Sequence, residues 1–483
     1  MIKEIALDKF KSFEQLDSLE IKPITILCGA NSSGKSSVIK SILSLKQSYE
    51  SESARNNMIM NGKYVNNGNM KSVIYNGIGD CFALKNTFVL IKARKDRYDQ
   101  DNYAIKMIEK IFKKMGKLRG NITIDYEIKF SKVDTDNSRK KNDSIMDLFK
   151  VMITTSYQDR KDIISKIELS RHQGQEFNYN LIWEEVPTQF GKLESNKLAC
   201  TCYFSGLQLV NIYAQNNDYS KIFEVISNIT TVFQVIAHQY KQISYLGPLR
   251  EEPARNYIFE SDVNEIGIKG ENAPFIFYSE DFMMKGNEYI LKEDKFVKNY
   301  TNKSFREHVL YWLDYIGIEN MKLGENNEII NLIVENDNIV DVGFGVSQAF
   351  PIIVEGIRIN KNSTLILEQP EIHLHPKMQM KIADFFISMA LSGKQIIIET
   401  HSDHMINRFV RRIMEDEKNN LNDMIGIHFI SKKEKRSEIT KINVDNVKGI
   451  VSWPKDFFDQ YNDETEKIID IGFSNLKKKI EQE

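Results

Sequence analysis

The chain contains 483 residues, of which 41% are hydrophobic and 10% are aromatic, and this is enough apolar material for one large globular domain or two smaller ones. The 65 lysines and arginines are balanced by 67 acidic residues, which leaves a formal net charge of -2. This balance excludes an overall positive field that would indicate a nucleic-acid partner, and it also excludes an acidic tail. Any contact with nucleic acid would have to be local.

Cysteine usage and the first residues both indicate the cytoplasm. The four cysteines, Cys28, Cys81, Cys200 and Cys202, form neither a CxxC pair nor a cluster with histidine at metal-ligand spacing. Residues 1–8 lack the basic patch and apolar run of a signal peptide, and no stretch approaches the roughly 18 apolar residues of a membrane span. We therefore expect a cytoplasmic protein in a reducing compartment, with no membrane partner.

The N-terminal residues predict the order strand, glycine-rich loop, helix. Strands are expected at residues 2–7 and 19–28, and the second ends in an apolar run that suits a strand buried on both faces. The glycine-rich loop follows at once. Residues 36–47 then carry apolar side chains at helical spacing, so that a helix is expected there.

Residues 51–240 show a different pattern, with polar turns, charged connectors and alternating strand-like runs such as residues 121–129. We expect an inserted, mixed α+β arm that ends in a helix at residues 220–242.

After the arm, the pattern tightens into alternating helices and strands. The expected elements are a helix at 304–315, a hairpin at about 322–342, helices at 347–359 and 376–391, and strands at 364–367 and 395–399. Alternation of this kind implies parallel strands joined by crossover helices. The predicted organisation is therefore two halves of one α/β head, at residues 1–50 and 241–410, separated by the arm at 51–240. Residues 411–483 form a C-terminal extension for partner or assembly contacts.

Gly29 to Ser36, Gly-Ala-Asn-Ser-Ser-Gly-Lys-Ser, matches the phosphate-loop pattern G-x-x-x-x-G-K-[ST] at every fixed position. Its glycines allow backbone N–H groups to turn inward around a β-phosphate, and the following helix adds its positive end. Lys35 would reach the β- and γ-phosphates, and the Ser36 hydroxyl would coordinate Mg²⁺. The alternative is an ordinary glycine-serine turn before a helix. The residues predicted to bind ATP here are Gly29, Asn31, Ser32, Ser33, Gly34, Lys35, Ser36 and Ser37.

A second set of polar residues follows two apolar strands in the C-terminal half. Thr364 to Glu368 is an apolar strand that ends in a carboxylate, as expected for an acid directed at Mg²⁺. The next residues are Gln-Pro-Glu-Ile-His-Leu-His-Pro, and a later strand ends in Glu-Thr-His-Ser-Asp-His. The pair His373 and His375 is more typical of a structural role than of a metal site, because no third ligand is evident.

The order of these motifs is specific. The phosphate loop, Gly343-Phe-Gly-Val-Ser-Gln348, the Glu368 segment and the segment around His401 together resemble the ATPases related to the ABC, SMC and OLD (overcoming lysogenization defect) proteins. The resemblance implies an α/β fold, namely an ABC-type P-loop ATPase head with a mixed sheet and flanking helices, plus the inserted α+β arm. It implies ATP and Mg²⁺ as cofactors.

The resemblance also implies a role for each motif. Glu368 matches the acid that binds Mg²⁺ together with Ser36. His401 matches the switch histidine that senses the γ-phosphate, although it could also be an ordinary packed histidine. Residues 372–375 match the D-loop that connects the two, and residues 10–13, Phe-Lys-Ser-Phe, match a segment beside adenine.

The signature loop of these families caps ATP that is bound to the opposite subunit. Gly345, Ser347 and Gln348 stand at the corresponding place, although the usual Leu-Ser-Gly-Gly pattern is absent and a plain turn before a helix is the alternative. Two subunits would sandwich ATP, so we expect a homodimer or a higher assembly of dimers.

One residue departs from the family pattern. The position after Glu368 usually holds a glutamate that deprotonates the attacking water, but here it is Gln369, and an amide cannot accept a proton as a carboxylate does. Glu371 and Glu399 are candidate substitutes. The hypothesis is slow hydrolysis, with rescue by Glu371 or Glu399 as the alternative. The predicted catalytic residues are Glu368, Gln369, His401, Glu371 and Glu399.

Two further segments, Tyr245 to Arg255 and Ser452 to Gln460, resemble a subset of these ATPases found in prokaryotic antiphage loci. Septu-type ATPases work with a separate nuclease subunit, so the resemblance implies a defence ATPase that controls such an effector. Arg250 and Arg255 could contact phosphate or a neighbouring subunit, or they could form surface ion pairs.

Two other functions stay open at this point. One is a DNA-repair ATPase of RecF type, which would use local basic clusters if they formed one stripe. The other is an ATP-dependent scaffold with negligible turnover, which Gln369 would suit. The basic clusters are Arg408, Arg411 and Arg412, and Lys432, Lys433, Lys435 and Arg436.

Overall fold

The structure is a computed structural model of the chain. It describes residues 1–53, 57–91, 103–112, 118, 120–133, 144–156, 162–186, 197–214, 219–258, 263–284, 288–299, 303–326, 329–418, 420–452, 454 and 460–480.

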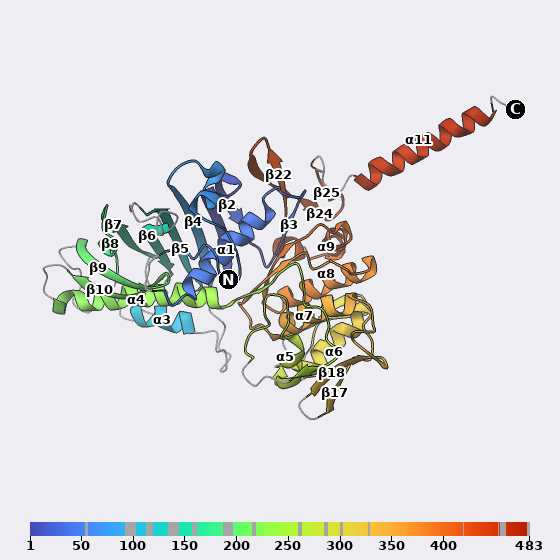
Figure 1. Ribbon diagram of the computed structural model, residues 1–483, viewed down its shortest axis with the longest axis horizontal. Coiled ribbons are helices and arrows are strands. Elements are labelled where there is room, and N and C mark those ends of the chain that lie inside the picture. Colours follow the sequence, from blue (N-terminus) through green and yellow to red (C-terminus); the bar gives the residue numbers. More distant parts are fainter. Residues whose placement is uncertain are drawn as a thin grey trace.

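A six-stranded mixed sheet forms the head and takes strands from both halves of the chain (Figure 1). Its order is β11-β20-β21-β3-β22-β23, and all neighbours are parallel except β22 and β23. The strands are β3 (Ile24–Cys28), β11 (Ile243–Leu246), β20 (Thr364–Glu368), β21 (Gln395–Glu399), β22 (Ile425–Lys433) and β23 (Arg436–Ile442). Because the carboxyl ends of parallel strands meet at one edge of a sheet, the loops after β3, β20 and β21 lie side by side.

Both faces of the head sheet are buried, which is why its strands are continuously apolar. Every residue of β3 is buried. Leu27 packs into a core shared with the arm, whereas its neighbours Ile26 and Cys28 pack into a second core on the opposite face. In β20, Ile366 packs into the core shared with the arm and Leu365 packs into the second core.

Helices cover the two faces of the head sheet. α1 follows the glycine-rich loop and contacts the arm helix α4 (Tyr219–Lys241), while α7, α8 and α9 pack with α6 on the other side (Figure 1). A capping box between Ser304 and Glu307 starts α6, and Gly317, with φ 104°, ends it. The helices of the head are α1 (Lys35–Tyr49), α5 (Ala273–Ser279), α6 (Phe305–Ile316), α7 (Gly345–Arg358), α8 (Pro376–Leu391) and α9 (Asp403–Glu415).

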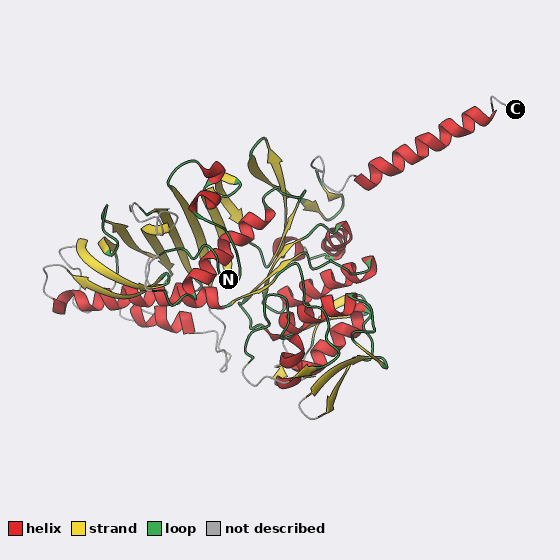
Figure 2. Ribbon diagram, in the orientation of Figure 1, coloured by secondary structure: helices red, strands yellow, loops and turns green. Residues whose placement is uncertain are grey.

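The arm is one nine-stranded antiparallel sheet in the order β10-β9-β8-β7-β6-β5-β4-β1-β2. Figure 2 shows these strands lying over the helices α3 (Tyr103–Phe112) and α4 (Tyr219–Lys241). Alternate residues of β5 are buried, as expected for a sheet with one covered face. The strands are β1 (Ile2–Phe10), β2 (Phe13–Glu20), β4 (Cys81–Leu90), β5 (Ile122–Lys132), β6 (Ser144–Thr155), β7 (Ile163–Arg171), β8 (Asn178–Glu184), β9 (Lys197–Ser205) and β10 (Gln208–Ala214).

Short elements complete the described residues. They are α2 (Met70–Val73), η1 (Tyr75–Gly77), β12 (Tyr257–Ile258), β13 (Met283–Met284), β14 (Tyr289–Lys292), β15 (Lys295–Lys298), β16 (Lys303–Ser304), β17 (Lys322–Asn326), β18 (Ile329–Val334), β19 (Asp337–Asn338), α10 (Asn420–Met424), β24 (Val444–Asp445) and β25 (Gly449–Ile450).

The predicted fold class, an α/β head with a mixed sheet and flanking helices plus an α+β arm, is confirmed. Two details differ. The strand expected at 19–28 is two strands, because Pro23 lacks the N–H group that a continuous ladder needs. The chain therefore leaves the arm sheet after Glu20 and enters the head sheet at Ile24.

The sheets also cross the predicted domain boundaries. β1 and β2, within residues 1–50, belong to the arm sheet, and β22 and β23, beyond residue 410, belong to the head sheet. β22 pairs with β3, from Ile425 beside Ile24 to Phe429 beside Cys28. The head therefore continues to at least Ile442.

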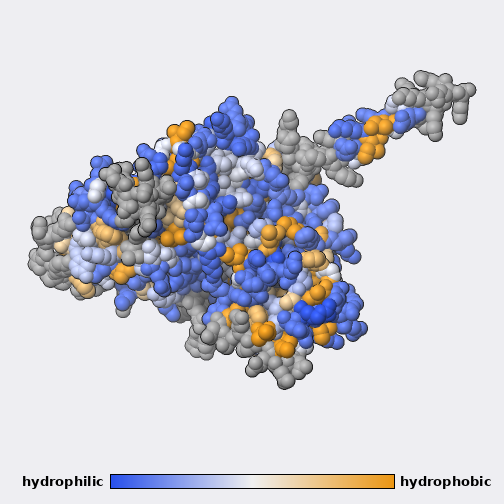
Figure 3. Space-filling view, in the orientation of Figure 1, coloured by the Kyte–Doolittle hydropathy of each residue, from blue (hydrophilic) through white to orange (hydrophobic). Residues whose placement is uncertain are grey.

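Helix α11 (Gln460–Ile480) extends away from the other elements (Figure 1). Figure 3 shows an apolar patch on it, where Ile468, Ile469, Ile471 and Phe473 are each more than half exposed. Of the helices in the described part of the chain, none combines the length and apolar character needed to cross a membrane.

Candidate nucleotide-binding site

The loop Gly29 to Ser36 connects β3 to α1 and has the backbone of a phosphate cradle. Gly29 and Gly34 have φ values of 141° and 114°, and Ser32 also has a positive φ of 59°. A Cβ at Gly29 would lie 2.1 Å from the carbonyl oxygen of Ile430, so the loop rests directly on β22. Only glycine fits these two positions.

The start of α1 has the chemical character of an anion-binding helix end. Gly34 is its N-cap, no side chain caps the helix, and no acidic residue occupies its first turn. Backbone N–H groups at such an end lack partners within the helix and attract phosphate. The Ser37 hydroxyl already has a hydrogen-bond partner, the Ser12 hydroxyl at 3.1 Å.

Lys35 is 3% exposed and lies over the loop. Its Nζ donates to the carbonyl oxygens of Gly29 at 3.0 Å and Ala30 at 2.7 Å. Burial lowers the pKa of Lys35, while nearby Glu399 and Glu371 counteract this effect. An ATP phosphate would give the ammonium group stronger, charged acceptors.

Two acids stand side by side at the carboxyl ends of β20 and β21, where Glu368 and Glu399 are register partners. Glu399 Oε1 accepts a hydrogen bond from the Ser36 hydroxyl at 3.1 Å. Glu368 Oε1 accepts one from the Tyr245 hydroxyl at 3.0 Å. Burial, and then repulsion from Glu368, raises the pKa of Glu399 to about 7.

These donors suit Mg²⁺, which prefers carboxylate and hydroxyl oxygens. Glu399 Oε2 is buried and has no partner among the described residues, so one oxygen remains for a ligand. The described part of the chain contains no group of three His, Cys, Asp or Glu residues that could hold a metal alone. This fits Mg²⁺, because it takes further ligands from phosphate and water. Ser36, Glu368 and Glu399 would hold the ion, which neutralises phosphate charge when bound.

The turn after β20 presents Glu371 toward the switch segment. Gln369 has a φ of 46°, and its N–H group donates to the Glu399 carbonyl oxygen at 2.7 Å. Glu371 Oε1 accepts a hydrogen bond from the backbone N–H of His401 at 2.7 Å, and Glu371 Oε2 is buried without a partner among the described residues. Burial raises the pKa of Glu371. Burial, and then the charge of Lys35, lowers the pKa of His401.

The predicted signature residues lie at the start of α7, beside the predicted D-loop. A Cβ at Gly345 would lie 3.3 Å from the His373 carbonyl oxygen, and the ring of Phe344 lies 5.9 Å from that of His373. Phe344 is 55% exposed, whereas Ser347 and Gln348 are buried. Gly345 and Phe344, more than Ser347 and Gln348, thus face outward.

His375 has a structural role, as the sequence favoured: its Nδ1 accepts a hydrogen bond from the Lys377 backbone N–H and caps α8. In the segment 10–13, Phe10 and Phe13 are fully buried in the arm core, so their rings are not available to stack on adenine.

The segment 245–255 lies against the site, which a single sequence could not reveal. Tyr245 contacts Glu368, and Arg250 is 6% exposed and donates to the carbonyl oxygen of Gln369 at 3.2 Å. Arg250 is therefore no surface ion-pair residue. Arg255 is one, because it pairs with Asp341 at 2.7 Å and both side chains are largely exposed. Of the other resembling segment, residues 453 and 455–459 lie outside the described residues.

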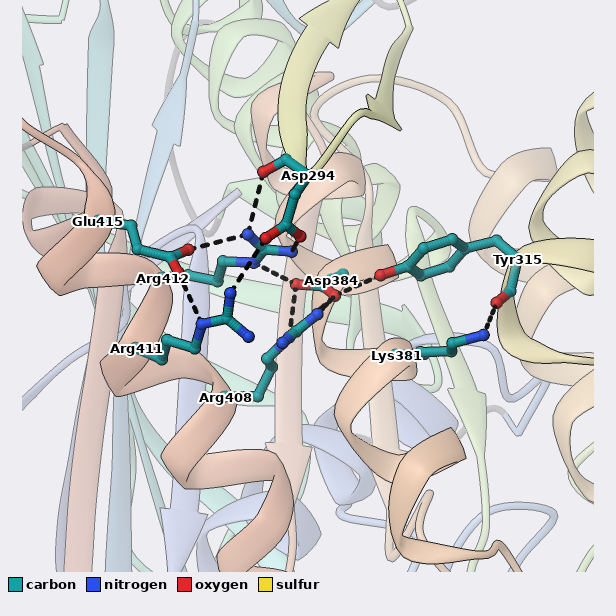
Figure 4. Close-up of polar contacts among 8 residues, drawn as sticks. All are labelled: Asp294, Tyr315, Lys381, Asp384, Arg408, Arg411, Arg412 and Glu415. Carbon is teal, nitrogen blue, oxygen red and sulfur yellow. Dashed lines mark hydrogen bonds and ion pairs between the residues drawn. The ribbon is translucent and has the colours of Figure 1, made fainter.

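The first basic cluster forms no free stripe. Arg408 and Arg412 both bind the buried carboxylate of Asp384, at 2.6 and 2.7 Å (Figure 4). Arg411 pairs with Asp294 and Glu415. In the second cluster, Lys433 and Arg436 share Glu438. The charges of the first cluster are thus neutralised within the protein, whereas the second cluster has only Glu438 as an ion-pair partner among the described residues.

The solved structures similar to this chain include three SMC heads. The first is the SMC head domain from Thermotoga maritima, with 10% sequence identity and a TM-score of 0.35; the match covers 92% of this chain and 99% of that chain. The second is the SmcHead bound to the C-winged helix domain of ScpA, with 12% identity, a TM-score of 0.37, and coverage of 92% of this chain and 99% of that chain. The third is the Smc head domain with an extended coiled coil bound to the C-terminal domain of ScpA derived from Pyrococcus furiosus, with 10% identity, a TM-score of 0.33, and coverage of 92% of this chain and 97% of that chain. No curated protein gives a significant match.

Sequence-family comparison gives a match across most of the chain. Residues 422–468 match a family described as a protein of unknown function (DUF3696). Residues 1–406 match the family described as AAA ATPase domain. This second match covers more than half of the chain and includes the phosphate loop, Glu368 and His401. The chain therefore belongs to the AAA ATPase domain family.

Proposed function

We propose that the protein is an ATP-dependent switch that binds Mg²⁺ and ATP at this site and hydrolyses ATP slowly. The observation that carries the proposal is the position of Gln369. It follows Glu368 at the edge of the sheet where the phosphate loop lies, yet its amide cannot take a proton from water. The two nearby acids with a buried free oxygen, Glu371 and Glu399, each use their other oxygen to hold a neighbouring group.

In this proposal, Lys35 and the first turn of α1 bind the phosphates, and Ser36, Glu368 and Glu399 hold the metal ion. Glu371 accepts the proton of the attacking water, with Glu399 as the alternative base if Ser36 and Glu368 hold the metal ion without it. Neither acid stands at the position that the family uses for this task. His401 senses the γ-phosphate, because Lys35 and Glu371 are its neighbours. Slow hydrolysis keeps the ATP-bound state long enough to act as a signal.

Steady-state turnover tests this proposal. Gln369→Glu should raise turnover by at least about tenfold, because it restores a general base. Glu371→Gln or Glu399→Gln should lower the residual rate. The Lys35→Ala variant, which should not bind ATP, measures the background rate of ATP hydrolysis in the assay. Fast turnover in the wild type, unaffected by either Glu→Gln change, contradicts the proposal. Undetectable turnover together with tight ATP binding supports a scaffold instead.

We also propose that the ATP-bound form is a homodimer or a higher assembly, and that it controls a separate effector, a nuclease, in antiphage defence. Support comes from the resemblance of the motif order and of Tyr245 to Arg255 to Septu-type ATPases. Direct action on DNA has less support, because Arg408, Arg411 and Arg412 are paired with acids.

A phage challenge tests the defence role. If the neighbouring gene encodes a nuclease, a bacterial host carrying both genes should lose fewer cells to phage than a host carrying either gene alone. Lys35→Ala should abolish the protection. Equal protection by the Lys35→Ala variant, or no protection by the pair, contradicts the role. A DNA affinity that falls steeply with salt would instead favour the repair alternative.

A further inference from the structure

Arg250 is a buried cation with unused hydrogen-bonding capacity. Its Nη1 donates to the carbonyl oxygens of Pro248 at 3.1 Å and Gln369 at 3.2 Å. Its Nε and Nη2 are buried and have no partner in the described part of the chain. Buried polar groups in proteins are almost always hydrogen-bonded, and an unpaired donor on a charged group is especially costly. Two free donors on one buried guanidinium therefore indicate a missing acceptor.

The surroundings identify the charge of that acceptor. Burial lowers the pKa of Arg250 to about 10, so it remains a cation at neutral pH, and the charges of Glu371 and Glu368 stabilise it. Neither acid forms an ion pair with it in the described part of the chain. Glu371 also acts on Lys35, so both cations border the same acid. A buried cation that forms no ion pair with the acids around it is most stable with a further anion in reach.

We propose that Arg250 binds the terminal phosphate of ATP and thereby distinguishes the triphosphate from the diphosphate. The planar guanidinium would donate from Nε and Nη2 to two phosphate oxygens, the geometry that arginine offers and lysine does not. Nη1 keeps its bond to Gln369, so the same side chain joins the phosphate to the turn that begins the predicted D-loop. This inference rests on the proposed binding of ATP at the loop.

The position of Arg250 on the chain supports this assignment. It follows β11, the edge strand of the head sheet, whose neighbour β20 carries Glu368. Tyr245, on β11 itself, donates to Glu368, so the segment 245–250 contacts both residues of the Glu368–Gln369 pair. The guanidinium is thus held at the carboxyl ends of the parallel strands, the side of the sheet on which the phosphate loop also lies.

Equilibrium binding of ATPγS and of ADP, both with Mg²⁺, tests the inference. Arg250→Gln should weaken ATPγS binding by about tenfold or more, the usual scale for charged hydrogen bonds, and should leave ADP binding within about twofold. Arg250→Lys keeps the positive charge but loses the two parallel N–H donors, so its affinity for ATPγS should fall between those of the wild type and Arg250→Gln. Arg255→Gln is the matched control, because it removes an exposed arginine of the same segment, and both affinities should stay unchanged.

Parallel loss of ATPγS and ADP affinity in Arg250→Gln, or no loss at all, overturns the inference. Thermal unfolding of each variant identifies a folding defect, and if Arg250→Gln does not fold, the ATPγS-to-ADP affinity ratio of Arg250→Lys decides. A ratio equal to that of the wild type then overturns the inference. If the wild type binds neither nucleotide, the proposed function itself fails, which is a distinct result.

Discussion

Among single residues, Glu399 links the site to pH. Its carboxyl is almost completely buried, and burial followed by repulsion from Glu368 raises its pKa from 4.5 to about 7. The folded protein therefore binds this proton more tightly than the unfolded chain does. The stabilisation is complete below pH 4.5 and is lost as the pH rises to about 7. Metal binding needs the deprotonated acid, so it should strengthen over the same interval.

Denaturant unfolding of the nucleotide-free protein at several pH values tests this linkage. Between pH 4.5 and about 7, the wild type should lose stability relative to Glu399→Gln, which has no proton to release at this position. Both proteins share all other titrating groups, so the difference between them isolates Glu399. A difference that does not change with pH contradicts the pKa assignment.

Local chemistry made part of the site predictable. Lys35, Ser36 and Glu368 belong to short motifs whose spacing alone fixes their geometry. Glu399 could be predicted as a member of the site because it ends a strand two residues before His401, but its bond to Ser36 spans 363 residues. Tyr245 and Arg250 stand 123 and 119 residues from their partners Glu368 and Gln369, and no pattern in one sequence encodes such pairs.

Between elements, the cluster around Asp384 fixes α8 against α9. α8 follows the predicted D-loop and α9 follows His401, so this contact sets the relative position of two parts of the site. Asp384 is completely buried, and it binds Arg408, Arg412 and the Tyr315 hydroxyl (Figure 4). Removing its charge leaves two arginines without their shared partner.

We expect Asp384→Asn to lower the free energy of unfolding by about 3–5 kcal/mol, the cost of breaking a buried ion pair on one side. Arg411→Gln is the control, because Arg411 is half exposed and exposed pairs contribute about 0–1 kcal/mol. Chemical denaturation measures both. Equal losses of unfolding free energy in the two variants would show that the buried ion pairs of Asp384 contribute no more to stability than an exposed pair.

Element boundaries were predictable where strong local signals exist. Residues 376–391 form a helix as expected, because Pro376 suits its first turn and an apolar pattern continues to Leu391. Sheet membership was not predictable. β1 and β2 pair with the arm and β22 pairs with β3, and both pairings are long-range contacts that hydrophobic alternation alone does not specify.

For the whole molecule, the proposed ATP-bound dimer uses two complementary surfaces. Each site would combine Lys35 of one subunit with the start of α7 of the other. Lys35→Ala and Gly343→Glu should therefore each be inactive alone, the second because a negative charge would face the partner's phosphate. Gly343 has open space around it, so the substitution should not disturb folding.

Mixing the two inactive variants should restore turnover to at most about a quarter of the wild-type value, because half of the dimers are mixed and each has one intact site. Light scattering with ATP and Mg²⁺ should show the dimer directly. The unmixed variants are the controls. An unchanged monomer mass, or no recovery on mixing, contradicts shared sites.

The contact between the phosphate loop and β22 has a consequence for biosynthesis. Gly29 rests on Ile430, and the Ser437 hydroxyl donates to the Ser33 carbonyl oxygen across 404 residues. During translation the loop leaves the ribosome first, and the strand that supports it follows about 400 residues later. A nascent chain thus carries the nucleotide-binding motif long before it can form the pocket. ATP would bind only after synthesis has passed β23, so that ligand binding would stabilise only chains that contain the whole head sheet.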